Sequence, residues 1–426
     1  MKVKVEKLVY GGKGLGRIDE KVCFIPFVIP GEEVEVKITE EKKSFLECEP
    51  VNVLKPSPYR TKPICQYFGY CGGCDYLHID YSKQVEQKNE IFAETVKRIG
   101  KIESVPLLEP IPSPFPTHYR NRVQFKVKGE RIGFYRKESR DIVNIHYCYL
   151  IKEELNSVIS SLKEILPFFG YFLSEIHLYS SSENQMVMKL LFNKPVNKVP
   201  LSLKHMKAFL TEDLNGYGIY LKTEKHPKKI QFIGTPFVYE TVKDYRFRVS
   251  ADSFFQVNRF QIENLIRLVE DEVKEENIKV AFDLYCGVGT FTIPIARYVD
   301  KVYGVEVNPY AVQDANHNKK LNKTQNAFFK RASASEALSY MVKKNPELIL
   351  VDPPRTGLDR NTIEVIDRIK QLKKIIYISC NPSTLARDLN LLKEKGFRLI
   401  SSRFIDMFPN TYHIESFSVL ERLNKS

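Results

Sequence analysis

Residues 282–291 read FDLYCGVGTF, an apolar run that leads through two glycines into a second apolar run. The first run is typical of a buried strand, and Gly287 and Gly289 let the backbone turn sharply and approach a ligand closely. Glu306 ends the next apolar run, where a carboxylate can accept two hydrogen bonds from a ribose diol. These features predict a strand, a turn and a helix that bind an adenosine-containing cofactor.

The sequence around this turn predicts the fold in which it lies. From about residue 255 onward, apolar runs alternate with amphipathic runs, which predicts an α/β domain: a Rossmann-like, doubly wound and mainly parallel sheet with helices on both faces. Ligands of such sheets bind at the carboxyl ends of the strands. A dinucleotide fingerprint would carry a third glycine at Thr292. S-adenosylmethionine, which needs no pyrophosphate turn, is therefore favoured over NAD.

A second motif follows the apolar run ELILV and reads Asp352-Pro353-Pro354-Arg355. Two prolines after a strand form a stiff turn with few backbone donors, which holds Asp352 at the edge of the sheet, where it can orient a nucleobase. Asp-Pro-Pro also occurs in methyltransferases that modify amino groups. The motif therefore indicates a methyltransferase but leaves the target atom open.

Two further residues are candidates for catalysis. Cys380 lies between the apolar run IIYIS and a predicted helix, and the positive end of a helix lowers the pKa of a thiol, so Cys380 is a candidate nucleophile. Alternation places His413 and Glu415 on one face of the last strand. A carboxylate in a strand as apolar as IESFSVL is costly unless it has a partner or a task, so Glu415 is a candidate base.

Four cysteines form a candidate metal site. Cys65, Cys71 and Cys74 lie close together in a glycine-rich segment, and Cys148 lies far downstream. Four thiolates can hold a zinc ion or a 4Fe–4S cluster. Structural zinc usually shows two close cysteine pairs, whereas three cysteines with a remote fourth suit a cluster better. The spacing therefore favours iron–sulfur over zinc.

The composition points to a soluble protein with a polyanionic partner. The 426 residues include 65 Lys and Arg against 52 Asp and Glu, a net charge of +13, and such a charge attracts nucleic acid. We find no secretion signal and no apolar stretch of about 20 residues. We therefore expect a cytoplasmic protein that does not cross a membrane.

The length predicts about three domains. Residues 1–57 alternate charged and apolar positions between glycine turns, as in a small β-barrel. Residues 58–245 read as a mixed α+β domain that carries the four cysteines, with a helix over 82–100 that packs on the catalytic domain and a hairpin around Gly129. Residues 246–426 form the predicted cofactor-binding domain.

Taken together, the motifs resemble those of the RNA uracil-C5 methyltransferase family, in its iron–sulfur-containing branch. SFFQVN, DLYCGVGTF, VDPPRTG, SCNPSTLARDL and HIES stand in the family's order, and the cysteine pattern is similar to the family's cluster ligands. Residues 1–55 look like a TRAM domain, an RNA-binding β-barrel. The resemblance covers nearly the whole chain.

The resemblance implies a reaction that suits these residues. Uracil C5 is a weak nucleophile, and a thiolate that adds to C6 converts the ring to an enolate whose C5 takes the methyl group of S-adenosylmethionine. The family pattern makes Cys380 this nucleophile and Glu415 the base that removes the C5 proton. It implies a 4Fe–4S cluster on the four cysteines. The residues expected at the cofactor are Gln256, Tyr285, Gly287, Gly289, Glu306 and Asp352.

The resemblance also implies a structured RNA as partner, 23S ribosomal RNA in the first place and tRNA as the alternative, for a monomer without a protein partner. The target uracil must be unstacked to be reached, and we expect Phe254 to stack on it. Asp352 and Gln256 are expected to touch the uracil as well, and Arg120 or Arg122 to help hold the enolate oxygen.

One stretch departs from the family pattern. Many relatives carry a small residue and an acidic residue after the strand near Phe328, where they contact the adenine. This chain instead reads Arg331-Ala332-Ser333-Ala334. We expect the backbone or Ser333 to take over this contact.

Three other functions compete with this interpretation. A radical methylthiotransferase also combines a TRAM barrel with a cluster, but it needs three cysteines spaced C-x3-C-x2-C, whereas here the first gap is five residues and a fourth cysteine is available. A noncatalytic RNA-binding or ribosome-assembly factor would use the charge and the barrel without Cys380. Methylation of an amino group would use Asp352 but no thiol.

Overall fold

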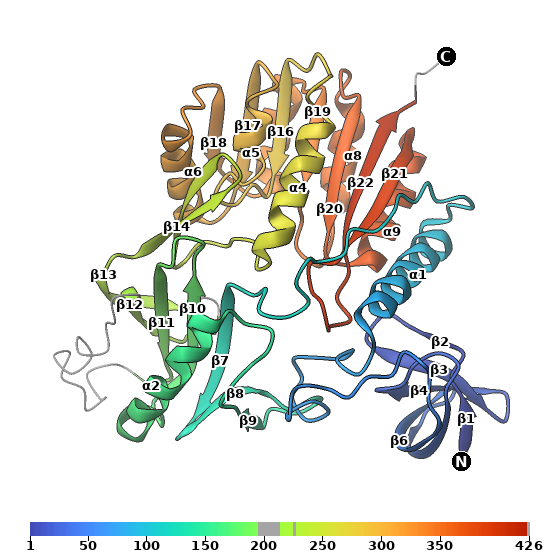
Figure 1. Cartoon of the computed structure of the whole chain (residues 1–426). Helices are drawn as coiled ribbons and strands as arrows, with labels where there is room; N and C mark the ends of the chain where they lie inside the picture. The colour runs from blue at the N-terminus through green and yellow to red at the C-terminus, as the bar shows by residue number, and fades with distance from the viewer. Residues whose placement is uncertain (195–213, 225–226, 424–426) are drawn as a thin grey trace.

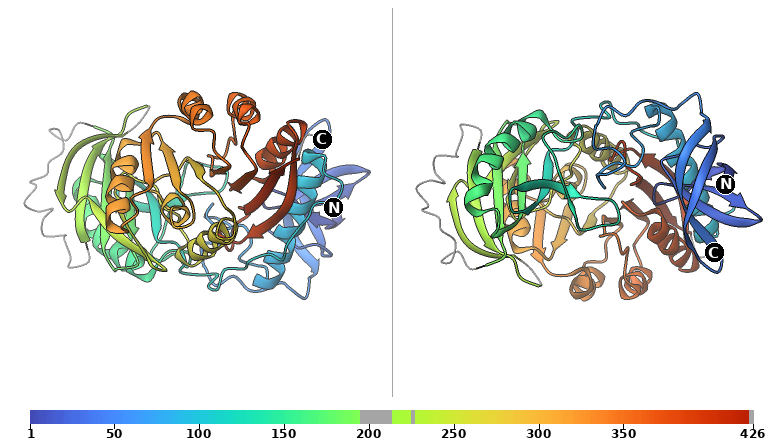
Figure 2. Two further views of the ribbon diagram at one scale, coloured as in Figure 1. Left: turned by 90° about the horizontal axis from the view of Figure 1, so that it is seen from above. Right: turned by 90° about the horizontal axis from the view of Figure 1, so that it is seen from below.

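The computed structural model describes residues 1–194, 214–224 and 227–423. Its strands form an N-terminal barrel-like sheet, a central sheet, a two-stranded hairpin and a large C-terminal sheet. In Figure 1 the C-terminal sheet lies above, and the central sheet and the barrel lie below it on opposite sides. The two views in Figure 2 likewise place the central sheet and the barrel toward opposite ends of the molecule.

The C-terminal sheet is the doubly wound sheet that the alternating sequence predicts. Its described strands run in the order β18-β17-β16-β19-β20-β22-β21, and among them β22 alone is antiparallel to its neighbours. The inner strands are apolar runs because helices cover both faces of the sheet. The strands are β16 (Val280–Leu284), β17 (Lys301–Glu306), β18 (Ala327–Arg331), β19 (Leu348–Val351), β20 (Lys374–Ser379), β21 (Phe397–Ile405) and β22 (Glu415–Arg422).

Helices cover this sheet in two apolar layers. One layer packs α4, α5 and α6 on one face, and the other packs α1, α7, α8 and α9 on the opposite face. Most of these helices begin after an Asn, Asp or Ser whose side chain caps the first turn. The helices are α1 (Tyr81–Gly100), α4 (Arg259–Asp271), α5 (Thr292–Ile295), α6 (Pro309–Leu321), α7 (Ala334–Lys344), α8 (Arg360–Arg368) and α9 (Pro382–Glu394).

The central sheet has the order β13-β12-β11-β10-β7-β8-β9, with α2 (Glu153–Phe169) packed on its apolar face. The hairpin expected around Gly129 is present, and Gly129 turns with a φ of 60°, which costs glycine no strain. The strands are β7 (Arg122–Lys128), β8 (Arg131–Tyr135), β9 (Ile142–Asn144), β10 (Leu173–Ser180), β11 (Met186–Phe192), β12 (Leu214–Leu221) and β13 (Lys228–Gly234).

A short hairpin links the central sheet to the C-terminal one. Its strands, β14 (Phe237–Val242) and β15 (Tyr245–Ser250), pair with each other and contribute to the same apolar layer as α4 and α6. The expected boundary at residue 245 falls inside this hairpin. A boundary before Phe237 would keep both strands with the sheet on which they pack.

The N-terminal residues form the small barrel-like sheet that their alternation predicts. Val3, Ile25 and Val34 point inward and are buried, whereas the charged residues between them face outward. The strands, in the spatial order β1-β5-β6-β4-β3-β2, are β1 (Lys2–Lys4), β2 (Lys7–Leu8), β3 (Lys13–Ile18), β4 (Lys21–Pro26), β5 (Glu33–Glu41) and β6 (Phe45–Lys55).

Helix α1 belongs to the core of the C-terminal sheet although it precedes the central sheet in the chain. It lies beside α9, and its apolar side chains share a layer with those of α7 and α8. Lys88 of α1 is fully buried and donates to Asp406 and to the carbonyl of Phe408, both at 2.9 Å. This buried ion pair ties α1 to the chain segment that follows β21.

No helix in the described part of the chain is long and apolar enough to cross a membrane.

We expect Lys88→Ala to destabilise the protein strongly, because it leaves the buried Asp406 carboxylate without a cation. Removing one partner of such a pair costs about 3–5 kcal/mol. Lys7→Ala is the control. Lys7 of β2 pairs with Glu94 of α1, and both side chains are exposed. Such exposed pairs contribute about 1 kcal/mol or less to stability. Urea unfolding followed by circular dichroism measures both. Equal midpoints for the two variants would contradict the role of the buried pair.

Candidate active site

Neighbouring strands bring the candidate catalytic residues to one edge of the C-terminal sheet. Asp352 follows β19 and Cys380 follows β20, and because these strands are parallel their carboxyl ends lie together. Strand β22 runs the other way and begins at Glu415, and its pairing sets Ser379 opposite Ser416. The next residues outward, Cys380 and Glu415, therefore leave the sheet side by side.

The glycine turn after β16 has room for a ligand. Gly287 and Gly289 have φ values of 53° and 86°, and a Cβ built on Gly287 would face open space. The Glu306 carboxylate holds the turn by accepting from the amides of Gly287 (3.1 Å) and Asn308 (2.8 Å). Gly289 does not line the cavity, and a Cβ there would lie 3.0 Å from the Phe329 ring. Gly289 thus allows the turn to pack closely against the Phe329 ring.

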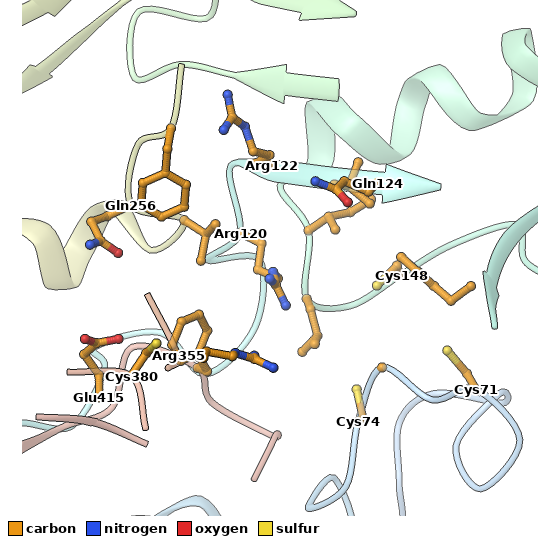
Figure 3. Close-up of a pocket in the computed structure, with 18 of the residues that line it drawn as sticks. Cys71, Cys74, Arg120, Arg122, Gln124, Cys148, Gln256, Arg355, Cys380 and Glu415 are labelled. Carbon is orange, nitrogen blue, oxygen red and sulfur yellow. The ribbon is translucent and has the colours of Figure 1, made fainter. Parts of the chain in front are cut away.

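A cavity of about 830 Å³ opens at this edge of the sheet and extends to the cysteine-rich segment. Figure 3 shows the cysteines on one side and Cys380 with Glu415 on the other. The cavity brings together nearly all of the site residues predicted from the sequence. Those that line it are Cys65, Cys71, Cys74, Cys148, Gln256, Tyr285, Gly287, Glu306, Asp352, Cys380 and Glu415.

Gln256 lies against Asp352 at the wall of this cavity. Its Nε2 donates to Asp352 Oδ2 at 3.2 Å, and its backbone carbonyl accepts from Asn121 Nδ2, also at 3.2 Å. The loop before it is anchored by Asp314 of α6, whose buried carboxylate accepts from the Ser253 hydroxyl at 2.6 Å. Gln256 is therefore held in place from two sides.

Two carboxyl groups share the innermost part of the cavity. Glu415 is 2% exposed, and burial, reinforced by the charge of Asp352, raises its pKa well above the usual value, while Arg355 opposes the shift. Burial also raises the pKa of Asp352 to about 7, against the hydrogen bond from Gln256. Both carboxyls therefore resist ionising together in the empty site.

The surroundings of Cys380 favour the protonated thiol, which corrects the expectation of a depressed pKa. Burial, together with the charges of Glu415 and Asp352, raises the pKa of Cys380 to about 12, and Arg355 only partly offsets them. Helix α9 does begin next to Cys380, with Asn381 as its cap. The two nearby carboxyls and the loss of hydration raise the pKa of Cys380 by more than the helix end lowers it.

Arg355 is a site residue that the sequence motifs do not single out. It lines the cavity, its charge favours the ionised forms of Glu415 and Cys380, and its Nη2 lies 3.3 Å from Nε2 of His413. The sequence signal that could have identified Arg355 is its position as the first cation after the Pro-Pro turn.

The prediction that His413 and Glu415 share one face of the last strand is wrong. Strand β22 begins at Glu415, and His413 lies in the loop before it.

Ser333 caps a helix. Its hydroxyl accepts from the amide of Glu336, whose carboxylate accepts in turn from the amide of Ser333. This capping box starts α7, and Ser333 does not line the cavity. The expected contact of Ser333 or the backbone with the adenine stays a prediction.

Arginines and an aromatic ring line the mouth of the cavity. Phe254 is 57% exposed and lines it together with Arg120 and Arg122. Arg122 donates to the carbonyl of Ser253 at 2.7 Å and lies over the Tyr179 ring. The mouth thus offers a face for stacking beside positive charge.

The four cysteines of the candidate metal site lie along one wall of the same cavity, and none forms a disulfide. Burial and the neighbouring sulfurs raise the pKa of Cys71 to about 11 and that of Cys74 well above its usual value. Burial raises that of Cys148 as well. In the described part of the chain, no three His, Cys, Asp or Glu side chains lie close enough to hold a single metal ion.

Comparison with protein families agrees with this arrangement. Residues 80–423 match the model of the tRNA (uracil-5-)-methyltransferases, and residues 1–51 match that of the TRAM domain. An RNA methyltransferase of Aquifex aeolicus is 39% identical over 99% of this chain and 98% of its own length. One of Clostridium acetobutylicum is 33% identical over 97% and 95%.

A solved structure shows the same architecture. The tRNA (uracil-54, C5)-methyltransferase of Pyrococcus abyssi, in complex with S-adenosyl-L-homocysteine, superposes with a TM-score of 0.78 at 28% identity, covering 98% of this chain and 99% of that one. With the family model over most of the chain, this likeness decides the assignment. The chain belongs to the tRNA (uracil-5-)-methyltransferase family and is an S-adenosylmethionine-dependent RNA methyltransferase with an N-terminal TRAM domain.

Proposed function

We propose that this enzyme methylates C5 of a uridine in structured RNA through a covalent bond between Cys380 and C6 of the uracil. Bound S-adenosylmethionine supplies the methyl group. The Cys380 sulfur adds to C6 and makes C5 nucleophilic. After methylation Glu415 takes the C5 proton, the C5–C6 double bond re-forms, and sulfur leaves.

The observation that carries this proposal is the pairing of β20 with β22, which sets Cys380 and Glu415 next to each other at one cavity. A reaction that adds at C6 and removes a proton from C5 needs a nucleophile and a base that can both reach adjacent carbons of one ring. Methylation of an amino group would leave Cys380 without a task.

The protonation of the empty site suggests when the nucleophile forms. Burial and two carboxyls keep Cys380 a thiol, whereas a cationic sulfonium beside it would favour the thiolate. Of the two carboxyls, Glu415 is the more buried and lies next to the sulfur. We propose that Glu415 ionises only in the loaded site, where it is needed as a base.

Gln256, Tyr285, Gly287, Glu306 and Asp352 are proposed to hold the cofactor. Glu306 ends β17 beside the open face of Gly287, where it can accept from the ribose hydroxyls. Gly289 supports the turn without reaching the cavity.

The four-cysteine wall suits a 4Fe–4S cluster better than zinc. A zinc ion would require four sulfurs at about 2.3 Å from one point, and in the described part of the chain no three His, Cys, Asp or Glu side chains are grouped so as to hold one metal ion. A cluster takes one thiolate at each of four iron corners, so its ligands need not meet. We propose that Cys65, Cys71, Cys74 and Cys148 hold such a cluster and that it stabilises this wall without taking part in methyl transfer.

For the RNA we propose 23S ribosomal RNA, on which the family resemblance expects bacterial relatives with a cluster and a TRAM barrel to act. One observation favours tRNA as a second candidate: the similar Pyrococcus abyssi enzyme acts on uracil 54 of tRNA. In either RNA the target base must be turned out of its stack to be reached.

Methylation should depend on Cys380 but not on Cys286, another thiol at the cavity edge of the sheet. We expect Cys380→Ser to abolish transfer of a tritiated methyl group while binding RNA as the wild type does, because a hydroxyl is far less acidic than a thiol. Cys286→Ser is the matched control and should retain activity. A methylation rate of Cys380→Ser equal to that of the wild type would reject the nucleophile.

Glu415→Gln should transfer the methyl group but fail to release the RNA. Removal of a general base slows its step by about 10²- to 10⁴-fold, so a covalent protein–RNA adduct should persist on a denaturing gel. The double variant with Cys380→Ser should show no adduct. Absence of an adduct in Glu415→Gln itself would exclude Glu415 as the base.

Alkylation of Cys380 should report its raised pKa. In the free enzyme we expect reaction with iodoacetamide to be slow at pH 7 and to accelerate up to the highest pH at which the fold persists, because the thiolate is the reactive form and its pKa is about 12. Arg355→Ala should slow alkylation further. Peptide mass spectrometry at Cys380 measures the rate, and a plateau below pH 8 would contradict the raised pKa.

The substrate is identified by nucleoside mass spectrometry of a strain that lacks the gene. We expect 5-methyluridine to disappear from one position of 23S ribosomal RNA and to return with the wild-type gene but not with Cys380→Ser. Its disappearance from tRNA instead would select the second candidate. Unchanged 5-methyluridine in both RNAs would reject the proposed reaction.

A further inference from the structure

Asp75, the residue after Cys74, lies where three parts of the chain meet. Its Oδ1 accepts from Lys137 of the central domain at 3.1 Å, and its Oδ2 accepts from the amide of Tyr412 at 3.3 Å. On the side of the barrel, a Cβ built on Gly12 would lie 3.1 Å from the Asp75 side chain. One nearly buried carboxylate thus joins the cysteine segment to the loop that precedes Glu415.

The backbone makes the same connection. The amides of Asp75 and Tyr76 both donate to the carbonyl of Asn410, at 3.0 and 3.1 Å. Asn410 has a φ of 64°, a conformation that costs a non-glycine residue energy. Its side chain accepts from Gln84 at 3.0 Å and donates to the carbonyl of Pro116 at 2.7 Å. These bonds hold the loop over 410–414 in a conformation that it would not adopt alone.

This loop leads directly into the catalytic carboxylate. Tyr412 packs against His413, with ring centroids 4.3 Å apart, and against Tyr10 of the barrel at 5.7 Å. His413 in turn lies against Arg355, whose charge favours the ionised form of Glu415. A shift at Tyr412 would therefore move both Glu415 and the cation beside it.

We propose that Asp75 is a positioning residue for the last step of the reaction, in which the methylated uracil leaves Cys380. This inference rests on the proposed function. In that step Glu415 takes the C5 proton, the electrons of the C5–H bond form the C5–C6 double bond, and the C6–S electron pair leaves with the sulfur. Asp75 acts only through the Tyr412 amide and the loop, and it touches neither the RNA nor the reacting atoms.

The test compares Asp75→Ala with Asp75→Asn. Asp75→Ala removes the acceptor for Tyr412, so we expect elimination to slow by about 10- to 100-fold, the cost of a misplaced catalytic group, and the covalent adduct to accumulate on a denaturing gel. Asp75→Asn keeps one oxygen that can accept from Tyr412 and should turn over at a rate within a few-fold of the wild type. Asp244→Ala, at a carboxylate on the surface far from the loop, is the control and should match the wild type.

A second readout follows the loop itself. Hydrogen exchange of the peptide over 408–415 should be faster in Asp75→Ala than in the wild type, whereas a peptide from β20 should exchange equally in both. Iron content, measured on the same samples, should be unchanged because the Asp75 carboxylate is not among the proposed ligands. Unchanged exchange over 408–415 would overturn the inference.

Glu415→Gln separates this inference from the proposed function. If Glu415→Gln traps the adduct and Asp75→Ala loses turnover without trapping it, Asp75 does not act through the base and the inference is overturned. If Glu415→Gln itself traps no adduct, the proposed role of Glu415 fails. Asp75 then has no catalytic base to position, and the inference about catalysis fails too, even if hydrogen exchange shows that Asp75 holds the loop.

Discussion

The antiparallel pairing of β22 with β20 is the constraint on which the active site depends. Every other described strand of the C-terminal sheet runs parallel to β20, so each presents its carboxyl end at the edge of the sheet where the cavity opens. A reversed last strand is the one arrangement that brings the beginning of a strand to that same edge. It sets Glu415 beside Cys380 through backbone hydrogen bonds, which fix the distance more firmly than a loop would.

This pairing brings groups together that repel one another when ionised. Among the described residues, no cation forms a hydrogen bond with the buried Glu415, and the Gln256 amide is the one side chain that donates to Asp352. Cys380 lies between these two carboxyls. Such a site costs stability, and stabilising contacts lie nearby. The Lys88–Asp406 pair fixes the start of the segment between β21 and β22, and the bonds of Asn410 fix its middle. These contacts hold the segment that leads to Glu415.

The sequence predicts the fold and most of the residues that line the cavity, because both depend on local patterns. Buried parallel strands are apolar runs, and residues that follow such runs meet at one edge, so Glu306, Asp352 and Cys380 were recognisable from position alone. The ionisation of Cys380 was predicted wrongly, since the helix start is a local feature whereas the opposing carboxyls come from distant strands. His413 was misplaced because alternation does not show where a strand begins.

A residue whose partners lie in other domains leaves no local pattern, and for this reason Asp75 cannot be assigned from the sequence. Arg355 stands next to the Asp-Pro-Pro motif, but its role depends on Cys380 and Glu415, which come from other strands of the same domain. Asp75 follows a cysteine in a glycine-rich loop, yet its partners lie 62 and 337 positions away. Helix α1 and the cysteine segment precede the central sheet in the chain but pack against the chain segment before Glu415. A TRAM barrel, a cysteine wall and a methyltransferase sheet thus converge on one loop. In the proposed mechanism, parts of the chain outside the catalytic sheet support the proposed base, Glu415, without contributing to the chemistry.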